Sequence, residues 1–457
     1  MNHWANQLSS QIPGVVWPAL TPARIAPLVA LLNQFEQTER LPVAALQARQ
    51  FRQLVTVAKH AARHSTFFRD RLATAGLTAS ELADPEGLQR LPVLTRRDIQ
   101  GAGEQLYCAR LPAGHGPTGT TSTSGSSGEP VVVQRTSINQ LMWRAITIRE
   151  HLWHQRDFTG RLAIIRANVE PGAPKNRRNW GPPVSEIFPS GTSHLLSINT
   201  DIAAQAQWLQ QINPHYLLTY PTNLAALLDE MSENTLSLPA LRQIRTIGET
   251  LTTAIRERVA QQLGIDVVDA YSSQEVGGIA LQCPHSGLYH IMSESLRVEV
   301  LDEQGNACAP GETGRVVITD LLNFATPLIR YDIGDYAQAG PLDCPCGRTL
   351  PTLNHIVGRQ RNMLRHPNGN RYWPLVGFDR YRDIAPIRQY QLIQKTLTRV
   401  EVRLVCDAPL TPVQEQQLGK VIVESLGYAF ELNFNYFERA LPRSAGGKFE
   451  EFVCEVR

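Results

Sequence analysis

Residues 216–271 decide the fold, and they read YLLTYPTNLAALLDEMSENTLSLPALRQIRTIGETLTTAIRERVAQQLGIDVVDAY. Short apolar runs rich in β-formers alternate here with runs that have the apolar spacing of amphipathic helices. The strand-like runs are 216–220, 244–247 and 266–271, and the helical runs between them are 223–231 and 252–263. Gly264 follows the second helical run and can adopt the positive φ of a C-cap. This alternation predicts the layers of an α/β fold.

The alternation extends back to about Arg161. Residues 162–165 predict a buried strand, and residues 201–212 predict a helix with Asp201 or Thr200 supplying the N-cap oxygen. Residues 1–100 predict mainly helices, and the clearest amphipathic stretch among them is 47–64.

After residue 271 the pattern changes to short β runs and turn formers. Residues 296–301 and 315–319 predict a hairpin or a small antiparallel sheet. Strand-like 400–405, helical 412–426 and strand-like 430–437 predict a compact α+β domain at the end of the chain. We therefore expect an α/β protein with two domains, a large N-terminal α/β domain at 1–357 and a small C-terminal α+β domain at 358–457.

Composition excludes several classes of protein. The 457 residues carry 44 basic and 42 acidic side chains, a net charge of +2, and no basic patch of the kind that binds nucleic acid. Pro13 and Pro18 interrupt the early apolar stretch, and no run approaches the roughly 18 apolar residues of a membrane span, so we expect neither secretion nor a membrane partner. Seven scattered cysteines, an odd number, indicate reduced thiols and a cytoplasmic location.

A loop dense in hydroxyls and glycines occupies residues 120–130, TTSTSGSSGEP. Its amides and hydroxyls can donate hydrogen bonds to phosphate oxygens, and its glycines permit close approach of the backbone. No GKS or GKT triplet closes the loop, so it is not a Walker motif. By itself the same composition is also typical of a flexible linker.

Residues 123–130 resemble the phosphate-binding motif of the acyl-adenylate-forming superfamily, in its phenylacetate-CoA ligase branch. Six further segments resemble motifs of that family in the expected order: GET at 248–250, DAYSSQEVG at 269–277, GLYHI at 287–291, TPLIRYDIGD at 326–335, VGR at 357–359 and LPRSAGGKF at 441–449. The resemblance covers about residues 90–450 and implies the fold of that family, with a C-terminal domain that rotates as a lid.

The resemblance implies ATP-dependent activation of a carboxylic acid, with an aromatic acid favoured, and transfer to a thiol, with CoA expected. A carboxylate that attacks the α-phosphate meets like charge, so catalysis depends on positioning and charge neutralisation. By resemblance Glu275 holds Mg²⁺, Asp335 accepts the ribose hydroxyls and Lys448 reaches the α-phosphate. The wider nucleotide-binding set is Thr123, Ser124, Gly125, Ser126, Ser127, Gly128, Gly248, Glu249, Tyr271, Ser272, Ser273, Arg330 and Arg359.

Tyr220, Gly277 and Gly278 are expected to line the pocket for the acid, although a tyrosine such as Tyr220 belongs more often to a core than to a pocket. Two departures from the family pattern keep other interpretations open. Arg361 stands where the family usually has an acidic residue after the hinge, and Glu129 stands where this branch commonly has lysine. The acceptor can therefore be an amine or a carrier-protein arm, and a non-catalytic nucleotide sensor also remains. A homodimer is a further possibility.

Two chelating pairs, Cys283-Pro-His285 and Cys344-Pro-Cys346, indicate a structural zinc site. Thiolates and imidazole in this ratio suit tetrahedral zinc, although a one-residue spacing is tighter than usual. The resemblance implies that Cys283 and Cys344 lie on neighbouring segments. His290 competes for the fourth position, and we expect His285 there because the family keeps a histidine at His290 even without the Cys-x-Cys pair. Unpaired cysteines are the alternative.

Overall fold

The computed structural model describes residues 4–8, 10–122, 130–359, 363–369, 371–372, 380–381, 383–406, 408–438, 440–443 and 449–456. The chain divides into two compact units, Met1–Val357 and Gly358–Arg457. No helix among the described residues is both long enough and apolar enough to cross a membrane.

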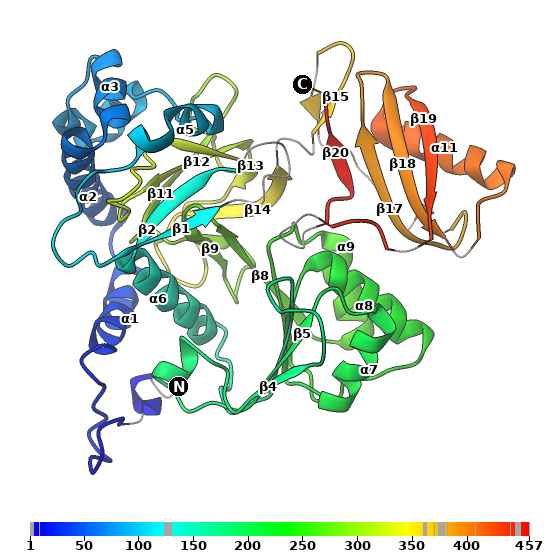
Figure 1. Ribbon diagram of the computed structural model, residues 1–457, viewed down its shortest axis with the longest axis horizontal. Helices are drawn as coiled ribbons and strands as arrows, with labels where there is room; N and C mark the ends of the chain where they lie inside the picture. The colour runs from blue at the N-terminus through cyan, green and yellow to red at the C-terminus, as the bar shows by residue number, and fades with distance from the viewer. Residues whose placement is uncertain are drawn as a thin grey trace. The chain divides into compact units, whose positions relative to one another are not determined.

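The first unit is built on one twelve-stranded sheet and its covering helices (Figure 1). The strand order is β11-β12-β13-β14-β10-β9-β8-β7-β6-β3-β5-β4, and β1 and β2 form a separate hairpin. The strands are β1 (Thr118–Ser122), β2 (Val132–Thr136), β3 (Leu162–Arg166), β4 (Lys175–Arg177), β5 (Ser193–Ser197), β6 (Tyr216–Thr219), β7 (Gln243–Ile247), β8 (Asp266–Ser273), β9 (Gly277–Gln282), β10 (Tyr289–Ile291), β11 (Leu296–Leu301), β12 (Thr313–Asp320), β13 (Tyr331–Ala339) and β14 (Thr352–Arg359).

The helices of this unit include those predicted at 201–212, 223–231 and 252–263 and a further one, Ser137–Trp153, that was not predicted. They are α1 (Ala26–Thr38), α2 (Val43–His64), α3 (Thr66–Thr74), α4 (Pro85–Arg90), α5 (Arg96–Ala102), α6 (Ser137–Trp153), α7 (Ile202–Ile212), α8 (Pro221–Glu233) and α9 (Thr253–Leu263), with short 3₁₀ turns at Trp4–Gln7, Ala79–Ala83, Gly103–Leu106 and Val184–Glu186. Asp201 caps α7 by accepting from the amide of Ala203 at 3.0 Å, and Gly264 ends α9 at φ +64°. Both expected helix boundaries are confirmed.

Strands β5, β3, β6, β7 and β8 are parallel neighbours with both faces covered. One face packs against α7, α8 and α9, which lie side by side in Figure 1, and its core includes Ile165, Leu217 and Ile244. The other face packs against α6 and α1, with Tyr216 and Ala270 in that core. Because a strand turns successive side chains to opposite faces, two-sided burial explains the nearly continuous apolar runs of these strands.

The other half of the sheet is antiparallel, and α2, α3 and α4 pack on residues of the 321–329 segment beside it. The predicted hairpin is confirmed as β11 and β12, paired from Leu296↔Asp320 to Leu301↔Arg315. It is not a separate small sheet, because β12 also pairs with β13 and so joins the main sheet at its edge.

The second unit is an α+β domain with a four-stranded sheet in the order β19-β18-β17-β20. Its elements are β15 (Leu364–Arg365), β16 (Arg371–Tyr372), β17 (Ile387–Gln394), β18 (Arg399–Cys406), α11 (Pro412–Leu426), β19 (Glu431–Phe437) and β20 (Phe452–Cys454). Helix α11 has the predicted bounds, with Thr411 as N-cap and Gly427 as an αL C-cap. Its apolar side chains Leu418, Ile422 and Leu426 pack in the core of this unit with the strands.

Candidate functional site

Tyr271 and Asp335 are joined by a hydrogen bond between β8 and β13. The Tyr271 hydroxyl donates to Oδ2 of Asp335 at 2.8 Å, and both side chains are buried. This hydrogen bond orients the carboxylate of Asp335. It also joins two motifs that lie far apart in the sequence, 269–277 and 326–335. An oriented carboxylate of this kind can accept hydrogen bonds from a pair of vicinal hydroxyls, because each of its two oxygens accepts.

Acidic side chains gather around the buried phenol of Tyr331, at the start of β13. The Tyr331 hydroxyl finds no hydrogen-bond partner among the described residues. Burial raises the pKa of Tyr331, and the negative charges of Glu275, Asp332 and Asp335 raise it further. The pKa of Asp332 is also raised, first by burial and then, among other effects, by Asp335. These influences place the acidic groups close enough to act on one another.

Glu275 lies in the short connection between β8 and β9. The Ser273 hydroxyl accepts a hydrogen bond from the amide of Val276 at 3.2 Å and closes this turn. The Glu275 side chain is 5% exposed, and within the described ranges it forms no ion pair. A buried carboxylate without a cation carries a large desolvation cost, which a bound cation relieves. Its oxygens are the ligands that Mg²⁺ prefers, so this residue fits a magnesium ion.

The Gly248-Glu249 turn follows β7, and Gly248 has φ +81°. Glu249 accepts from the amide of Thr222 at 3.0 Å and from its hydroxyl at 2.8 Å. The Glu249 carboxylate therefore satisfies a free amide at the N-terminus of α8, where negative charge is stabilised. Thr222 was not expected from the sequence, since nothing in the spacing connects positions 222 and 249.

Arg330 does not have the role expected for it. Its Nη1 donates to the carbonyl oxygens of Gln89 and Leu91, both at 2.7 Å, and its Nε and Nη2 face the Glu299 carboxylate at 3.3 and 3.2 Å. The side chain is 3% exposed. The expectation that Arg330 binds the nucleotide is therefore corrected, because its donors already hold the end of α4 against β11.

The residues expected to line the acid pocket lie in two different places. Tyr220 is buried in the core under α7 and α8, where its hydroxyl accepts from the amide of Ala167 at 3.3 Å, so the core interpretation applies to it. Gly278 lines a small hollow with Arg135 and Ile146, and a Cβ at Gly278 would lie 3.0 Å from Ile146. Gly277 has φ +83°, and a Cβ there would lie 2.9 Å from the guanidinium of Arg135. Arg135 was not foreseen.

Of the remaining expected residues, the structure describes some and leaves others outside the described ranges. Ser272 is exposed at the end of β8, and Arg359 is the last residue of β14. Thr123, Ser124, Gly125, Ser126, Ser127, Gly128 and Lys448 lie outside the described residues, as do Glu129 and Arg361. The residues on either side of 123–129 are described. Ser122 pairs with Val132, so the 123–129 segment connects the two strands of the β1–β2 hairpin.

The cysteine and histidine pairs do converge, but with a different histidine from the one expected. Ligand atoms of Cys283, His290, Cys344 and Cys346 all lie within 4.8 Å of one another. His285 is exposed and outside this group, because the turn after Cys283 directs it to another surface. The choice of His285 over His290 is thereby corrected.

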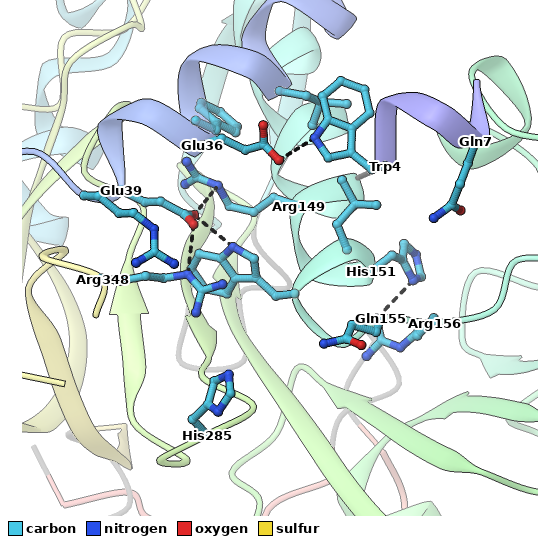
Figure 2. A pocket seen from close by; sticks show the side chains of 15 residues that line it. Trp4, Gln7, Glu36, Glu39, Arg149, His151, Gln155, Arg156, His285 and Arg348 are labelled. Carbon is cyan, nitrogen blue, oxygen red and sulfur yellow. Dashed lines mark hydrogen bonds and ion pairs between the residues drawn. The ribbon is translucent and has the colours of Figure 1, made fainter. Parts of the chain in front are cut away.

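A cavity of about 540 Å³ lies between α1 and α6, away from the expected nucleotide residues (Figure 2). Glu39 lies on its wall, where it accepts from Nε1 of Trp153 at 3.0 Å and pairs with Arg348 at 3.2 Å. His285 is found on this cavity, well below Glu39 in Figure 2.

Comparison with known proteins agrees with these motifs. The family model described as AMP-binding enzyme matches residues 187–324. The phenylacetate-coenzyme A ligase of Thermus thermophilus is 24% identical over 413 residues, covering 85% of this chain and 88% of that protein. The enzyme of the same name from Escherichia coli is 24% identical over 360 residues, covering 73% and 75%. A crystal structure of 2-hydroxyisobutyryl-CoA ligase in the postadenylation state with 2-HIB-AMP has the same fold, with a TM-score of 0.71 at 17% identity over 92% of this chain and 91% of that one.

Proposed function

We propose that the chain is an AMP-forming acid–thiol ligase of the acyl-adenylate-forming superfamily, in its phenylacetate-CoA ligase-like branch. In the first half-reaction a carboxylate oxygen of the acid attacks the α-phosphorus of ATP, and the bond to pyrophosphate breaks. In the second, a thiol sulfur attacks the acyl carbon of the adenylate, AMP leaves and the thiol proton is lost to solvent. CoA is the proposed thiol, since the relatives are named as CoA ligases.

The observation that carries this proposal is the acidic cluster at β8 and β13. Asp335, oriented by Tyr271 at 2.8 Å, would accept the ribose hydroxyls of the nucleotide. Glu275, buried without an ion pair within the described ranges, would hold Mg²⁺. When bound, Mg²⁺ supplies charge neutralisation on the phosphates. One group on β13 and one in the β8–β9 connection would thus hold the nucleotide while the acid approaches, which supplies positioning.

The proposal assigns the remaining contacts to segments outside the described residues. Residues 123–128 would donate to the phosphates, and Lys448 would neutralise charge between the α-phosphate and the attacking carboxylate, as a compact ammonium can. The 358–457 domain would act as the lid that brings Lys448 to the first half-reaction and withdraws it for the second.

For the acid we propose a small aromatic carboxylate, which rests on the names of the phenylacetate-CoA ligase relatives. Gly277 and Gly278 would form one wall of its pocket, since Gly278 lines a hollow with Arg135 and Ile146 and a Cβ at either glycine would approach one of these side chains closely.

The test is ATP–pyrophosphate exchange with phenylacetate, benzoate, 2-hydroxyisobutyrate and acetate, followed by product analysis with CoA, hydroxylamine and a carrier protein. We expect exchange that depends on an aromatic acid, and a CoA thioester as product. Exchange with none of these acids would favour a nucleotide sensor, and product formed only with an amine or carrier protein would contradict the CoA assignment. Lys448→Ala should abolish exchange but leave thiolysis of supplied acyl-adenylate intact.

A further inference from the structure

We propose that Cys283, His290, Cys344 and Cys346 bind one structural Zn²⁺ ion, which goes beyond the ligase function. The cluster joins two parts of the chain that are far apart in sequence. Cys283 follows β9 and His290 lies in β10, whereas Cys344 and Cys346 lie in the connection between β13 and β14. Cys283, Cys344 and His290 are buried, and Cys346 is half-buried.

The separations between the ligand atoms match a tetrahedral zinc site. Sγ of Cys283 lies 3.8 Å from Sγ of Cys344, and Sγ of Cys346 lies 3.3 Å from Nε2 of His290. Zinc bound at about 2.3 Å from sulfur and about 2.0 Å from nitrogen places tetrahedral ligands roughly 3.5–3.8 Å apart, close to these two separations. Three sulfurs and one imidazole nitrogen are also a ligand set that favours zinc over magnesium or calcium.

The surroundings of the cluster orient its ligands as a metal site requires. Nδ1 of His290 lies 3.1 Å from the carbonyl oxygen of Leu350, so a proton on Nδ1 leaves the Nε2 lone pair directed at Cys346. The amide of Arg348 donates to Sγ of Cys346 at 3.4 Å. Gly347 has φ +77°, and its amide donates to the carbonyl oxygen of Cys344 at 3.0 Å, which closes the Cys-Pro-Cys turn.

A disulfide accounts for this arrangement less well than a metal does. A disulfide requires its sulfurs at about 2.05 Å and uses only two of them. A bridge between Cys283 and Cys344 would leave the third sulfur and the imidazole of His290 facing each other at 3.3 Å with no role. Zinc uses all four groups and needs no oxidant.

The ion would fasten the β13–β14 connection to β9 and β10, next to contacts that hold the same connection to α1 and α6. Arg348 follows the last cysteine by two residues, pairs with Glu39 at 3.2 Å, and lies over the ring of Trp153 at 4.1 Å. The amide of Thr349 donates to the carbonyl oxygen of Glu39 at 2.9 Å. Glu39, Trp153 and Arg348 line the cavity in Figure 2. By fixing Cys346, two residues before Arg348, the metal would help to hold this wall of the cavity in place.

The test measures metal directly and does not require ligase activity. Full-length protein purified without chelator should contain one zinc ion per chain by elemental analysis. Replacement by Co²⁺ should give the intense thiolate charge-transfer bands and visible absorption of a tetrahedral Cys₃His site. Full-length protein that folds without bound zinc and shows no such spectrum with Co²⁺ would overturn the proposal, and so would a disulfide among these cysteines in freshly purified protein.

Variants identify the ligands. Cys346→Ser should weaken zinc binding by more than the roughly 10–100-fold expected for loss of a supporting contact. His290→Ala should do the same, whereas His285→Ala is the matched control and should retain the ion. Loss of zinc in His285→Ala but not in His290→Ala would overturn the ligand set. Should Cys346→Ser or His290→Ala fail to fold, the sulfur and nitrogen coordination numbers of the wild-type zinc site, measured by X-ray absorption, decide the same question.

Discussion

Glu150 and Glu275 are both buried glutamates, but only Glu150 meets cations inside the described part of the protein. Glu150 is fully buried in α6, at 2.9 Å from Nη2 of Arg156 and in contact with Arg245. Burial alone would raise the pKa of Glu150, but the charges of Arg245 and Arg156 outweigh it and lower the pKa to about 2. Glu275 is also buried but has no such pair with any of the described residues. The difference teaches that a carboxylate neutralised internally supports the fold, whereas one left without a cation is available to bind one from outside.

The largest effect should come from removing the charge of Glu150. Glu150→Gln leaves the buried Arg156 and the half-buried Arg245 without this counter-ion, and breaking a buried pair in this way costs about 3–5 kcal/mol. Urea unfolding followed by fluorescence measures the loss. Glu170→Gln is the matched control, because Glu170 pairs with Lys175 on the exposed surface, and its free energy of unfolding should not change measurably. Equal losses in the two variants would mean that burial does not distinguish them.

Glu275→Gln should have the opposite profile. We expect ATP–pyrophosphate exchange to fall by about 10²–10³-fold, the usual cost of losing one group that stabilises transition-state charge. The free energy of unfolding should stay the same or rise, since a buried uncompensated charge is removed. Glu257→Gln, on the exposed side of α9, is the control for both measurements. A variant that loses stability but keeps exchange would place Glu275 with Glu150 as a structural residue.

Acid titration should reveal the contribution of Glu150 through a smaller free-energy difference. The pKa of Glu150 is about 2 in the folded protein against 4.5 as its ordinary value, so its contribution is fully present above about pH 4.5. The contribution is lost as the pH falls from about 4.5 towards 2, because the unfolded chain takes up the proton first. About 3 kcal/mol is at stake, from 1.36 kcal/mol per unit. Unfolding free energies of Glu150→Gln should therefore fall less steeply than those of the wild type across this range.

The smallest effect is expected at Tyr271. Tyr271→Phe removes the hydroxyl that orients Asp335, and a hydrogen bond to a charged group contributes about 1.5–3 kcal/mol. We expect the KM for ATP to rise about 10-fold with little change in kcat. Tyr289→Phe is the matched control, because the Tyr289 hydroxyl donates to the buried Asp269 at 2.9 Å elsewhere on the same sheet. A similar KM in both variants would show that the hydroxyl of Tyr271 only stabilises the fold.

The fold was largely predictable because its signals are local. The caps at Asp201 and Gly264 and the run at Pro412–Leu426 are set by neighbouring residues, and the structure has them where the sequence predicts. The assignment of β11 and β12 to the main sheet was not predictable, since it depends on pairing with β13, which the alternation of residues within the hairpin does not encode.

The site was less predictable because its contacts are long-range. His290 reaches the cysteines through strand pairing, with partners Leu281 on β9 and Thr352 on β14, whereas the spacing of the Cys-Pro-His triplet suggested His285. Similarity to a motif identified Arg330 but not its partners Gln89 and Glu299, which lie far away in the sequence.

Both ends of the segment that carries Lys448 are fastened to β17. Before it, the amide of Leu441 donates to Oε1 of Gln389 at 2.8 Å, and after it the carbonyl oxygen of Glu450 accepts from Nε2 of Gln391 at 2.9 Å. Strand β20 then pairs in parallel with β17, from Leu392↔Phe452 to Gln394↔Cys454. The described residues on either side of 444–448 are therefore held against the same strand, so β17 fixes both points where the chain enters and leaves that stretch. Removal of the last few residues of the chain would delete β20 and loosen the second of these two attachments.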